Sequence, residues 1–241
     1  MDKKAVEEML QQRKYILKGA LGHGGQARVY LVQKQGYTGE EYQACKIGKR
    51  ERLETEGRLL RSIQHPCFPR YIDYWQWEQL GVLLMEYIAG KNLEEWLRQE
   101  KIPFLLVDSW SHSLVEAVKC LHNMPEVWIY RDLKPSNVII RRDGKLKLID
   151  MGCACPISCV AKSVAGTPGY CAPEQLCTPE QVGIYSDYYG LGKIIDRLLA
   201  QSCPKGICGW GRYFKWRRFC KRCLRVEIEK RNGITAIFEK C

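Results

Sequence analysis

The sequence lacks any long apolar run. Its apolar stretches, such as residues 82–85 and 104–107, are far shorter than the roughly 18–20 residues that a membrane-spanning helix needs. The start of the chain, MDKKAVEEMLQQRKY, carries charges every few positions and contains no apolar segment typical of a secretory signal. We therefore expect a cytoplasmic protein with no membrane span.

Low-complexity linkers and internal repeats are also absent. Hydrophobic residues make up 46% and charged residues 27% of the 241 positions, which is typical of a globular chain rather than a disordered one. A chain of this length buries well over half of its unfolded surface, so its core needs no disulfide or structural metal.

Cysteine is abundant, but the number is odd. With thirteen cysteines and no export signal, reduced thiols are a better interpretation than a disulfide framework. Four of them follow a C-x4-C and C-x2-C pattern: Cys203, Cys208, Cys220 and Cys223. This pattern leaves two interpretations open, a tetrahedral zinc site or ordinary buried thiols.

Basic residues outnumber acidic ones and give a net charge of +11. This charge favours acidic proteins, nucleic acid or anionic membrane surfaces as partners. Seven basic residues lie between positions 212 and 225, interleaved with aromatic residues: Arg212, Lys215, Arg217, Arg218, Lys221, Arg222 and Arg225. The stretch predicts either an amphipathic helix with a solvated basic face or a docking site for an acidic partner. Nothing before residue 200 supports a nucleic-acid site, so we do not expect a nucleic-acid partner.

Residues 15–85 contain short β-prone runs broken by glycine and polar turns. The runs are 29–32, 42–47, 71–77 and 81–84. Between residues 50 and 64, Leu53, Leu60 and Ile63 share one helical face, and His65-Pro66 ends the segment. This half predicts a small antiparallel sheet that carries one helix.

After Gly90 the apolar residues recur at three- and four-residue steps, in 110–121 and again in 188–198, which predicts buried helices. Between them, residues 138–140 and 145–149 flank Asp143-Gly144 and predict a short hairpin. The second half is therefore mainly helical, and the fold class is α+β.

Two features of the first half have a chemical interpretation and a structural one. The segment GHGGQARVY at 22–30 places glycines where a backbone approaches a ligand closely, but it equally fits a hairpin turn. Lys46 lies between apolar neighbours, where a charge needs an anionic partner unless it projects outward from an edge strand.

The strongest chemical signal is the stretch YRDLKPSN at 130–137, followed by Asp150-Met151-Gly152. It places two carboxylates, an amide and a lysine on loops beside one hairpin. Phosphoryl transfer needs such a set: a carboxylate to receive a proton, oxygen ligands for magnesium, and cations to offset charge.

From about Tyr15 to Arg231 the chain resembles the eukaryotic-type protein kinase family, since these motifs agree with it in type, order and spacing. The resemblance implies a single catalytic domain over 1–241. It implies a two-lobed fold, with a small N-lobe of antiparallel sheet and one helix at about 15–87 and a mainly helical C-lobe at about 88–241. ATP and Mg²⁺ are the implied cofactors.

The resemblance also implies the role of each site residue. The implied catalytic residues are Asp132 as the base, Lys134 at the γ-phosphate, Lys46 at the α- and β-phosphates, and Glu56 as the partner of Lys46. The implied nucleotide-binding residues are Gly22, Gly24, Gly25, Val29, Ala44, Lys46, Met85, Glu86, Ile88, Asn137 and Asp150, with Met85 to Ile88 as the hinge. Asn137 and Asp150 are the implied magnesium ligands.

Glu56 is only ten positions after Lys46, which is short for the family and implies a curtailed connection. Glu54 and Glu51 remain alternatives, although each would point to another face of the helix.

The segment 166–174 resembles the family's peptide-substrate segment, which ends in Ala-Pro-Glu. Lys134 together with Thr167 is the serine/threonine combination, so the implied substrates are proteins with Ser or Thr acceptors. Glu174 and Arg231 resemble a buried ion pair of the second lobe. Asp187 resembles the aspartate that anchors the family's catalytic loop, which corresponds to residues 130–137 here.

Two positions depart from the family pattern, Tyr130 for histidine and Met151 for phenylalanine, and we expect both to supply similar packing. Arg131 beside Asp132 favours regulation by phosphorylation, with Ser158 and Ser163 as the available hydroxyls. A catalytically weak pseudokinase and a small-molecule kinase remain the alternative functions.

Overall fold

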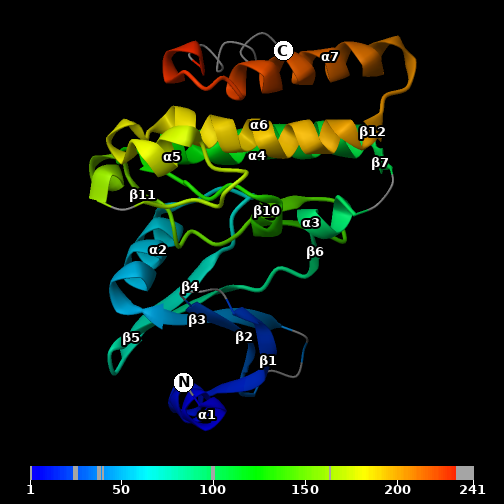
Figure 1. The fold of residues 1–241 in the computed structure, drawn as a ribbon. Coiled ribbons are helices and arrows are strands. Elements are labelled where there is room, and N and C mark those ends of the chain that lie inside the picture. The colour runs from blue at the N-terminus through cyan, green and yellow to red at the C-terminus, as the bar shows by residue number, and fades with distance from the viewer. Residues whose placement is uncertain are drawn as a thin grey trace. The chain divides into compact units, whose positions relative to one another are not determined.

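The computed structural model describes residues 2–23, 27–36, 39, 41–98, 101–162 and 164–231. Its internal contacts divide the chain into two compact units. The first comprises Met1–Gln64 and Phe68–Ile88, and the second comprises His65–Cys67 and Ala89–Cys241. Each unit has its own sheet and its own helices (Figure 1).

The first unit contains a five-stranded antiparallel sheet in the order β1-β2-β3-β5-β4. The strands are β1 (Tyr15–His23), β2 (Ala27–Lys34), β3 (Tyr42–Lys49), β4 (Tyr71–Trp77) and β5 (Leu80–Glu86). The four predicted strands are therefore confirmed: β4 has the predicted bounds, and β2, β3 and β5 are longer than their apolar runs because backbone pairing continues into neighbouring residues.

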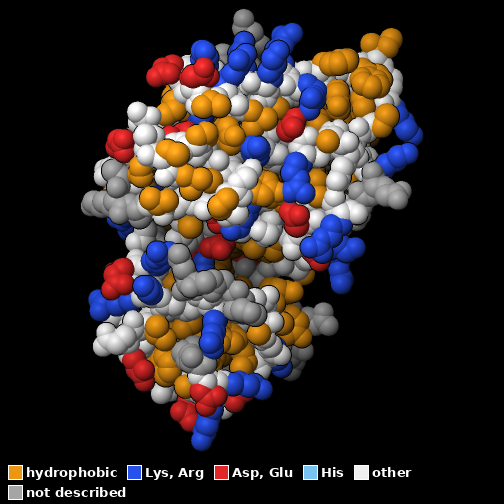
Figure 2. Space-filling view, in the orientation of Figure 1, with side chains coloured by type: hydrophobic (Ala, Val, Ile, Leu, Met, Phe, Trp, Pro, Cys, Tyr) orange, Lys and Arg blue, Asp and Glu red, His pale blue; other side chains and the backbone are white. Residues whose placement is uncertain are grey.

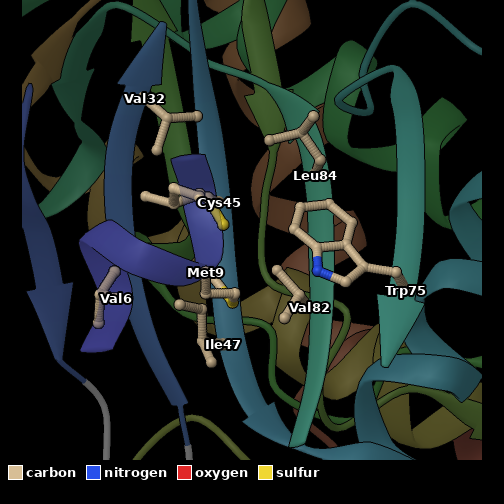
Figure 3. Close-up of a cluster of buried hydrophobic side chains, with 9 residues drawn as sticks. Val6, Met9, Val32, Cys45, Ile47, Trp75, Val82 and Leu84 are labelled. Atoms are coloured by element: carbon tan, nitrogen blue, oxygen red, sulfur yellow. The ribbon is translucent and has the colours of Figure 1, made fainter. Parts of the chain in front are cut away.

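The N-terminal helix α1 (Lys3–Gln12) was not predicted. Its apolar residues Val6, Met9 and Leu10 are fully buried. They pack against one face of the sheet, where Val32, Cys45, Ile47, Trp75, Val82 and Leu84 form the rest of the cluster (Figure 3). This helix precedes the stretch 15–85, for which one helix was predicted, so that prediction still agrees with the described residues. Three apolar residues among many charged ones are enough to make a helix face when a sheet covers them.

The predicted helix at 50–64 is present as α2 (Arg50–Ser62), and it begins directly after β3. Alternation along β5 shows which face α2 covers. Val82 and Leu84 contact the α1 cluster, whereas a Cβ at Gly57 of α2 would lie 3.3 Å from Leu83. Since neighbouring residues of a strand point to opposite faces, α1 and α2 cover opposite faces of the sheet.

Three long helices form the second unit: α4 (Phe104–His122), α6 (Ile184–Ala200) and α7 (Gly206–Cys223), with α7 on the outer side of α6 (Figure 1). The predicted hairpin is confirmed as β9 (Val138–Arg141) and β10 (Leu146–Leu148), and Gly144 turns it with φ of 79°. The shorter elements are β6 (Gly90–Asn92), α3 (Leu93–Trp96), β7 (Ile102–Pro103), β8 (Trp128–Ile129), η1 (Pro135–Asn137), β11 (Cys155–Pro156), η2 (Ile157–Lys162), α5 (Pro173–Cys177), η3 (Pro179–Gln181), β12 (Ser202–Cys203) and η4 (Ile228–Arg231).

Helices α6 and α7 approach so closely that a Cβ at Gly192 would lie 2.5 Å from the Cβ of Cys223. Cys220 and Cys223 are buried in this contact, while Cys203 and Cys208 are exposed. Burial raises the pKa of Cys220 to about 12 and raises that of Cys223 well above its usual value, which disfavours the thiolates that zinc requires.

The zinc interpretation is wrong for these four cysteines. Over the part of the chain that the structure describes, no three His, Cys, Asp or Glu side chains are grouped so that they could hold a metal ion. Among the same residues, no helix is long and apolar enough to cross a bilayer.

Candidate active site

Some of the predicted site residues lie in the first unit and others lie in the second. In the first unit, Lys46 of β3 pairs with Glu56 of α2. The Lys46 Nζ lies 2.9 Å from Oε1 and 2.8 Å from Oε2 of Glu56. The two residues are 6% and 1% exposed, so water does not screen this ion pair.

The predicted choice of Glu56 is confirmed. Because α2 starts immediately after β3, ten residues are enough to bring Glu56 opposite Lys46. Glu51 and Glu54 are exposed, so the two alternatives are wrong. The curtailed connection is also confirmed, since no residue separates the strand from the helix.

The described residues of the glycine-rich segment belong to the end of β1 and the start of β2. Gly22 pairs with Val29 across the two strands, beside a β-bulge between Ala20 and Gly22. Gly24 and Gly25 lie outside the described residues.

The expected hinge residues lie on and directly after β5, next to Ala44 of the neighbouring strand β3. Ala44 of β3 is buried and pairs with Met85 of β5, and Ile88 is buried as well. The N–H of Glu86 donates to the Arg70 carbonyl at 2.9 Å, and the Glu86 carboxylate accepts from the Arg70 N–H at 3.0 Å. That N–H of Glu86 is therefore already committed, and adenine would need other backbone groups of the hinge.

In the second unit, Asp132, Lys134 and Thr167 form a triangle of polar contacts. Lys134 Nζ lies 2.8 Å from Asp132 Oδ2 and donates to Thr167 Oγ at 3.0 Å. The Thr167 hydroxyl donates to Asp132 Oδ1 at 2.6 Å. The predicted contact of Thr167 with both residues is confirmed, and it fastens the segment 166–174 to the catalytic loop.

Asn137 completes this group from η1. Its side-chain amide donates to the Asp132 carbonyl at 3.0 Å and to Asp132 Oδ2 at 3.2 Å. The amide nitrogen thus holds the carboxylate in place, and the amide oxygen is the atom of Asn137 suited to a cation.

Asp150 is exposed and adopts a φ of 63°. Its Oδ1 accepts from the Gly152 N–H at 3.2 Å. Carboxylate and amide oxygens are the donors that Mg²⁺ prefers, so Asp150 and Asn137 fit the implied magnesium by the chemistry of their donor atoms.

Asp187 of α6 holds the catalytic loop in an unusual conformation. Its carboxylate accepts from the N–H groups of Tyr130 and Arg131, each at 2.8 Å, and contacts His122 Nε2 at 2.9 Å. Arg131 has a φ of 66°, which costs about 1–2 kcal/mol for a residue with a Cβ. These hydrogen bonds offset that cost, so the expected anchoring by Asp187 is confirmed.

Tyr130 links the catalytic loop to the segment before Asp150. Its side chain is fully buried, and its hydroxyl donates to the backbone carbonyl of Ile149. Burial, and after it the carboxylates of Asp150 and Asp132, raises the pKa of Tyr130 well above its usual value. The hydroxyl therefore stays protonated and remains a donor. Met151 is also buried, at 1% exposure, so both departures from the family pattern supply packing as predicted.

Gln175 was not singled out by the sequence. Its buried amide donates to the carbonyls of Arg131 at 2.7 Å and Ala165 at 2.9 Å, while its oxygen accepts from the Ala172 N–H at 3.0 Å. Gln175 thus ties the catalytic loop to the segment 166–174. Glutamine has no catalytic signature of its own, and its position directly after Ala-Pro-Glu was the one available signal.

The predicted pair of Glu174 and Arg231 is present and buried, with oxygen-to-nitrogen distances of 2.6 and 3.0 Å. Ser158, one expected phosphorylation site, lies exposed on η2. Ser163, the other one, lies outside the described residues. The guanidinium of Arg131 donates to the Cys153 carbonyl at 2.7 Å, which joins the catalytic loop to the segment that precedes Ser158.

The fold of the two units and the geometry of the loops agree with a comparison of the sequence with models of protein families. The protein kinase domain matches residues 15–206, well over half of the chain. The chain therefore belongs to the protein kinase family, of eukaryotic type.

Within the family, the chain is similar to serine/threonine kinases. It is 32% identical over 192 residues to the serine/threonine-protein kinase RUNKEL of Arabidopsis thaliana, covering 75% of this chain and 14% of that protein. It is 30% identical over 194 residues to the human cAMP-dependent protein kinase catalytic subunit PRKX, covering 76% of this chain and 53% of that protein. A cAMP-dependent protein kinase catalytic subunit of Dictyostelium discoideum is 32% identical over 211 residues, covering 83% of this chain and 31% of that protein. The chain thus spans about half, or much less, of the length of these relatives.

Proposed function

We propose that the protein is an ATP-dependent serine/threonine protein kinase, which transfers the γ-phosphoryl group of MgATP to Ser or Thr hydroxyls of protein substrates. The observation that carries the proposal is the Asp132, Lys134 and Thr167 triangle, with Asn137 holding the same carboxylate. Similarity to serine/threonine kinases from a plant and from human supports it.

In the proposed reaction, Asp132 accepts the proton of the substrate hydroxyl as that oxygen attacks the γ-phosphorus. Its Oδ1 already accepts a hydrogen bond from an alcohol, the Thr167 hydroxyl, at 2.6 Å. Lys134, at 2.8 Å from Oδ2, offsets negative charge on the transferring group. The phosphorus–oxygen bond to the β-phosphate breaks, and ADP leaves.

The remaining residues position the nucleotide. Lys46, oriented by Glu56, provides a cation for the α- and β-phosphates, and the hinge residues hold adenine. Asn137 and Asp150 would hold magnesium, which would neutralise phosphate charge when bound. Asp187 and Tyr130 keep the loops that carry these groups in place.

The test is phosphate transfer from labelled ATP and magnesium to the protein itself and to generic protein substrates. We expect transfer by the wild type, with the label on serine or threonine, and a loss of about 10³-fold or more in Asp132→Ala and Asp150→Ala. Asp143→Ala is the matched control, since Asp143 lies exposed in the hairpin turn.

Two results would contradict the proposal. ATP binding without transfer by folded wild-type protein would favour a pseudokinase that acts as a nucleotide-binding module. Transfer only to small molecules such as aminoglycosides or choline would favour a small-molecule kinase.

A further inference from the structure

The outer face of α7 has a feature that phosphate transfer does not use. No Asp or Glu occurs between Asp196 and Glu227, although this stretch contains the whole of the 18-residue helix. Residues three and four apart lie on one side of a helix, and α7 exposes apolar and basic side chains at this spacing. We call them the α7 ridge: Ile207, Trp210, Phe214, Arg218, Lys221 and Arg222.

The opposite face of α7 fixes the ridge in an outward orientation. Trp216 and Phe219 are buried, and the Trp216 indole donates to Asp108 of α4 at 2.8 Å. Arg212 also donates to the Asp108 carboxylate at 2.8 Å. These contacts hold the helix in one rotation, so the ridge is a defined surface of the second unit.

The first half of the ridge is apolar and strongly exposed. Ile207 is 93%, Phe214 62% and Trp210 44% exposed. The Trp210 ring lies 5.7 Å from that of Phe214, and Tyr213 lies within 5.9 Å of both. The apolar side chains therefore form one pre-ordered cluster, in contrast to the isolated apolar residues common on protein surfaces.

The second half of the ridge is basic and lacks counter-charges. Arg218, Lys221 and Arg222 form no ion pair with any residue that the structure describes, whereas their neighbour Arg217 pairs with Asp196. In Figure 2, which has the orientation of Figure 1, apolar and basic side chains lie next to each other at the top of the view, where Figure 1 shows α7.

We propose that the α7 ridge binds the anionic surface of a lipid bilayer. Ile207, Trp210 and Phe214 would enter the boundary between headgroups and acyl chains, and the three basic residues would contact the headgroups. Stable attachment of a peripheral protein needs two signals, and an apolar anchor beside a basic cluster supplies both.

The form of the ridge favours a bilayer over other occupants. It projects from a helix on the outer side of the second unit (Figure 1), so it suits a flat and deformable partner better than a segment that needs a groove. A second copy of the chain would oppose like charges at this face. An acidic protein could also complement the basic residues, and the experiment below separates it from a membrane.

The test is co-sedimentation of the full chain with vesicles of phosphatidylcholine alone and of phosphatidylcholine with about 30% phosphatidylserine. We expect binding only to the anionic vesicles, weakened by salt. The triple variant Arg218→Gln, Lys221→Gln, Arg222→Gln should bind roughly 100-fold more weakly, about fivefold for each charge lost. The variant Trp210→Ser, Phe214→Ser should lose roughly tenfold or more.

The matched control is Lys3→Gln, Lys4→Gln, Lys18→Gln, which removes the same charge from exposed positions of the first unit and should change binding by less than about threefold. Phosphate transfer in solution should be unchanged in all three variants, which also verifies folding. This readout separates a failure of the membrane proposal from a failure of the kinase assignment.

Four results would overturn the proposal. The first is no sedimentation of folded wild type with anionic vesicles, and the second is an equal loss of binding in the control variant. The third is binding of soluble polyglutamate through the ridge without vesicle binding, which would indicate an acidic protein partner. The fourth is self-association in solution that the Trp210→Ser, Phe214→Ser variant abolishes, which would indicate a second copy.

Discussion

Two buried ion pairs among the described residues, Glu174–Arg231 and Lys46–Glu56, each join a glutamate to a basic residue but differ in structure. Arg231 engages both oxygens of Glu174 and also donates to the carbonyls of Tyr185, Arg225 and Val226. Lys46 engages both oxygens of Glu56 through a single ammonium group. An arginine whose donors are bound to backbone on several sides is a structural connector, whereas a lysine presents one compact charge that can also serve a phosphate.

The difference teaches that burial alone does not separate a structural pair from a functional one. Both acids and both bases are nearly inaccessible to water. What distinguishes the pairs is the chemistry of the cation: the Arg231 guanidinium is bound to backbone carbonyls on several sides, whereas the Lys46 ammonium is a compact charge for which a phosphate has a reason to compete.

The largest expected effect is on stability. Glu174→Gln should lower the free energy of unfolding by about 3–5 kcal/mol, because it leaves the Arg231 charge buried without its counter-ion. Urea unfolding measures this loss, with Glu180→Gln as the control at an exposed position. A loss below about 1 kcal/mol would show that the backbone carbonyls alone satisfy Arg231.

The next largest effect is on activity rather than on stability, and it concerns the pair of Lys46 and Glu56. The free energy of unfolding of the double variant Lys46→Met, Glu56→Leu should differ from that of the wild type by no more than roughly 1–2 kcal/mol, since apolar residues of similar size often replace a buried pair at little cost. Its phosphate transfer should fall by about 10³-fold, because the cation for the phosphates is gone.

The opposite result in that double variant would contradict the distinction between the two ion pairs. Near-normal transfer together with a large loss of stability would make Lys46 and Glu56 a structural pair like Glu174 and Arg231. Urea unfolding and phosphate transfer measured on the same preparation decide between the two.

A smaller effect on stability is expected from the hydrogen bond between the Tyr130 hydroxyl and the Ile149 carbonyl. Tyr130→Phe removes the hydrogen bond to Ile149 and should lower the free energy of unfolding by about 1–2 kcal/mol at neutral pH. Because the folded pKa of Tyr130 is raised above 10.0, its stabilisation is complete below that pH and is lost as the pH rises towards the folded pKa. The difference between wild type and variant, followed by unfolding from pH 8 to pH 11, should therefore shrink on the alkaline side; a constant difference would contradict this.

The smallest expected effect is on stability, and it concerns a hydrogen bond that Ser186 donates to Glu174. Ser186→Ala removes one hydrogen bond to Glu174 Oε1, now 2.8 Å long, and should cost about 1 kcal/mol. Urea unfolding measures this small loss of stability. Phosphate transfer by the same variant should be unchanged. A loss as large as that of Glu174→Gln would mean that the hydroxyl, rather than Arg231, fixes the carboxylate.

Much of the site could be predicted because its motifs resemble those of the protein kinase family in type, order and spacing. Asp132, Lys134, Asn137 and Asp150 are polar residues in short loops beside a hairpin that the alternation of residues 145–149 already indicates. Glu56 followed from helix geometry, since it alone of three glutamates shares a buried face with Leu53 and Leu60.

Other features depend on contacts that the local sequence does not encode. The helix α1 exists because the sheet covers Val6, Met9 and Leu10, and a short amphipathic stretch alone does not indicate that cover. The positive φ of Arg131 is fixed by Asp187, which lies 56 positions later. The role of Gln175 likewise appears only when Arg131 and Ala165 are in place around it.

The most direct test of the central claim is single-turnover phosphate transfer by wild type and by Asp132→Asn, which keeps the shape of the side chain and removes its basic oxygen. We predict that both proteins bind ATP and unfold alike, and that the variant transfers phosphate to serine or threonine at least about 10²-fold more slowly. Equal rates in the two proteins would contradict Asp132 as the catalytic base, and with it the proposed kinase mechanism.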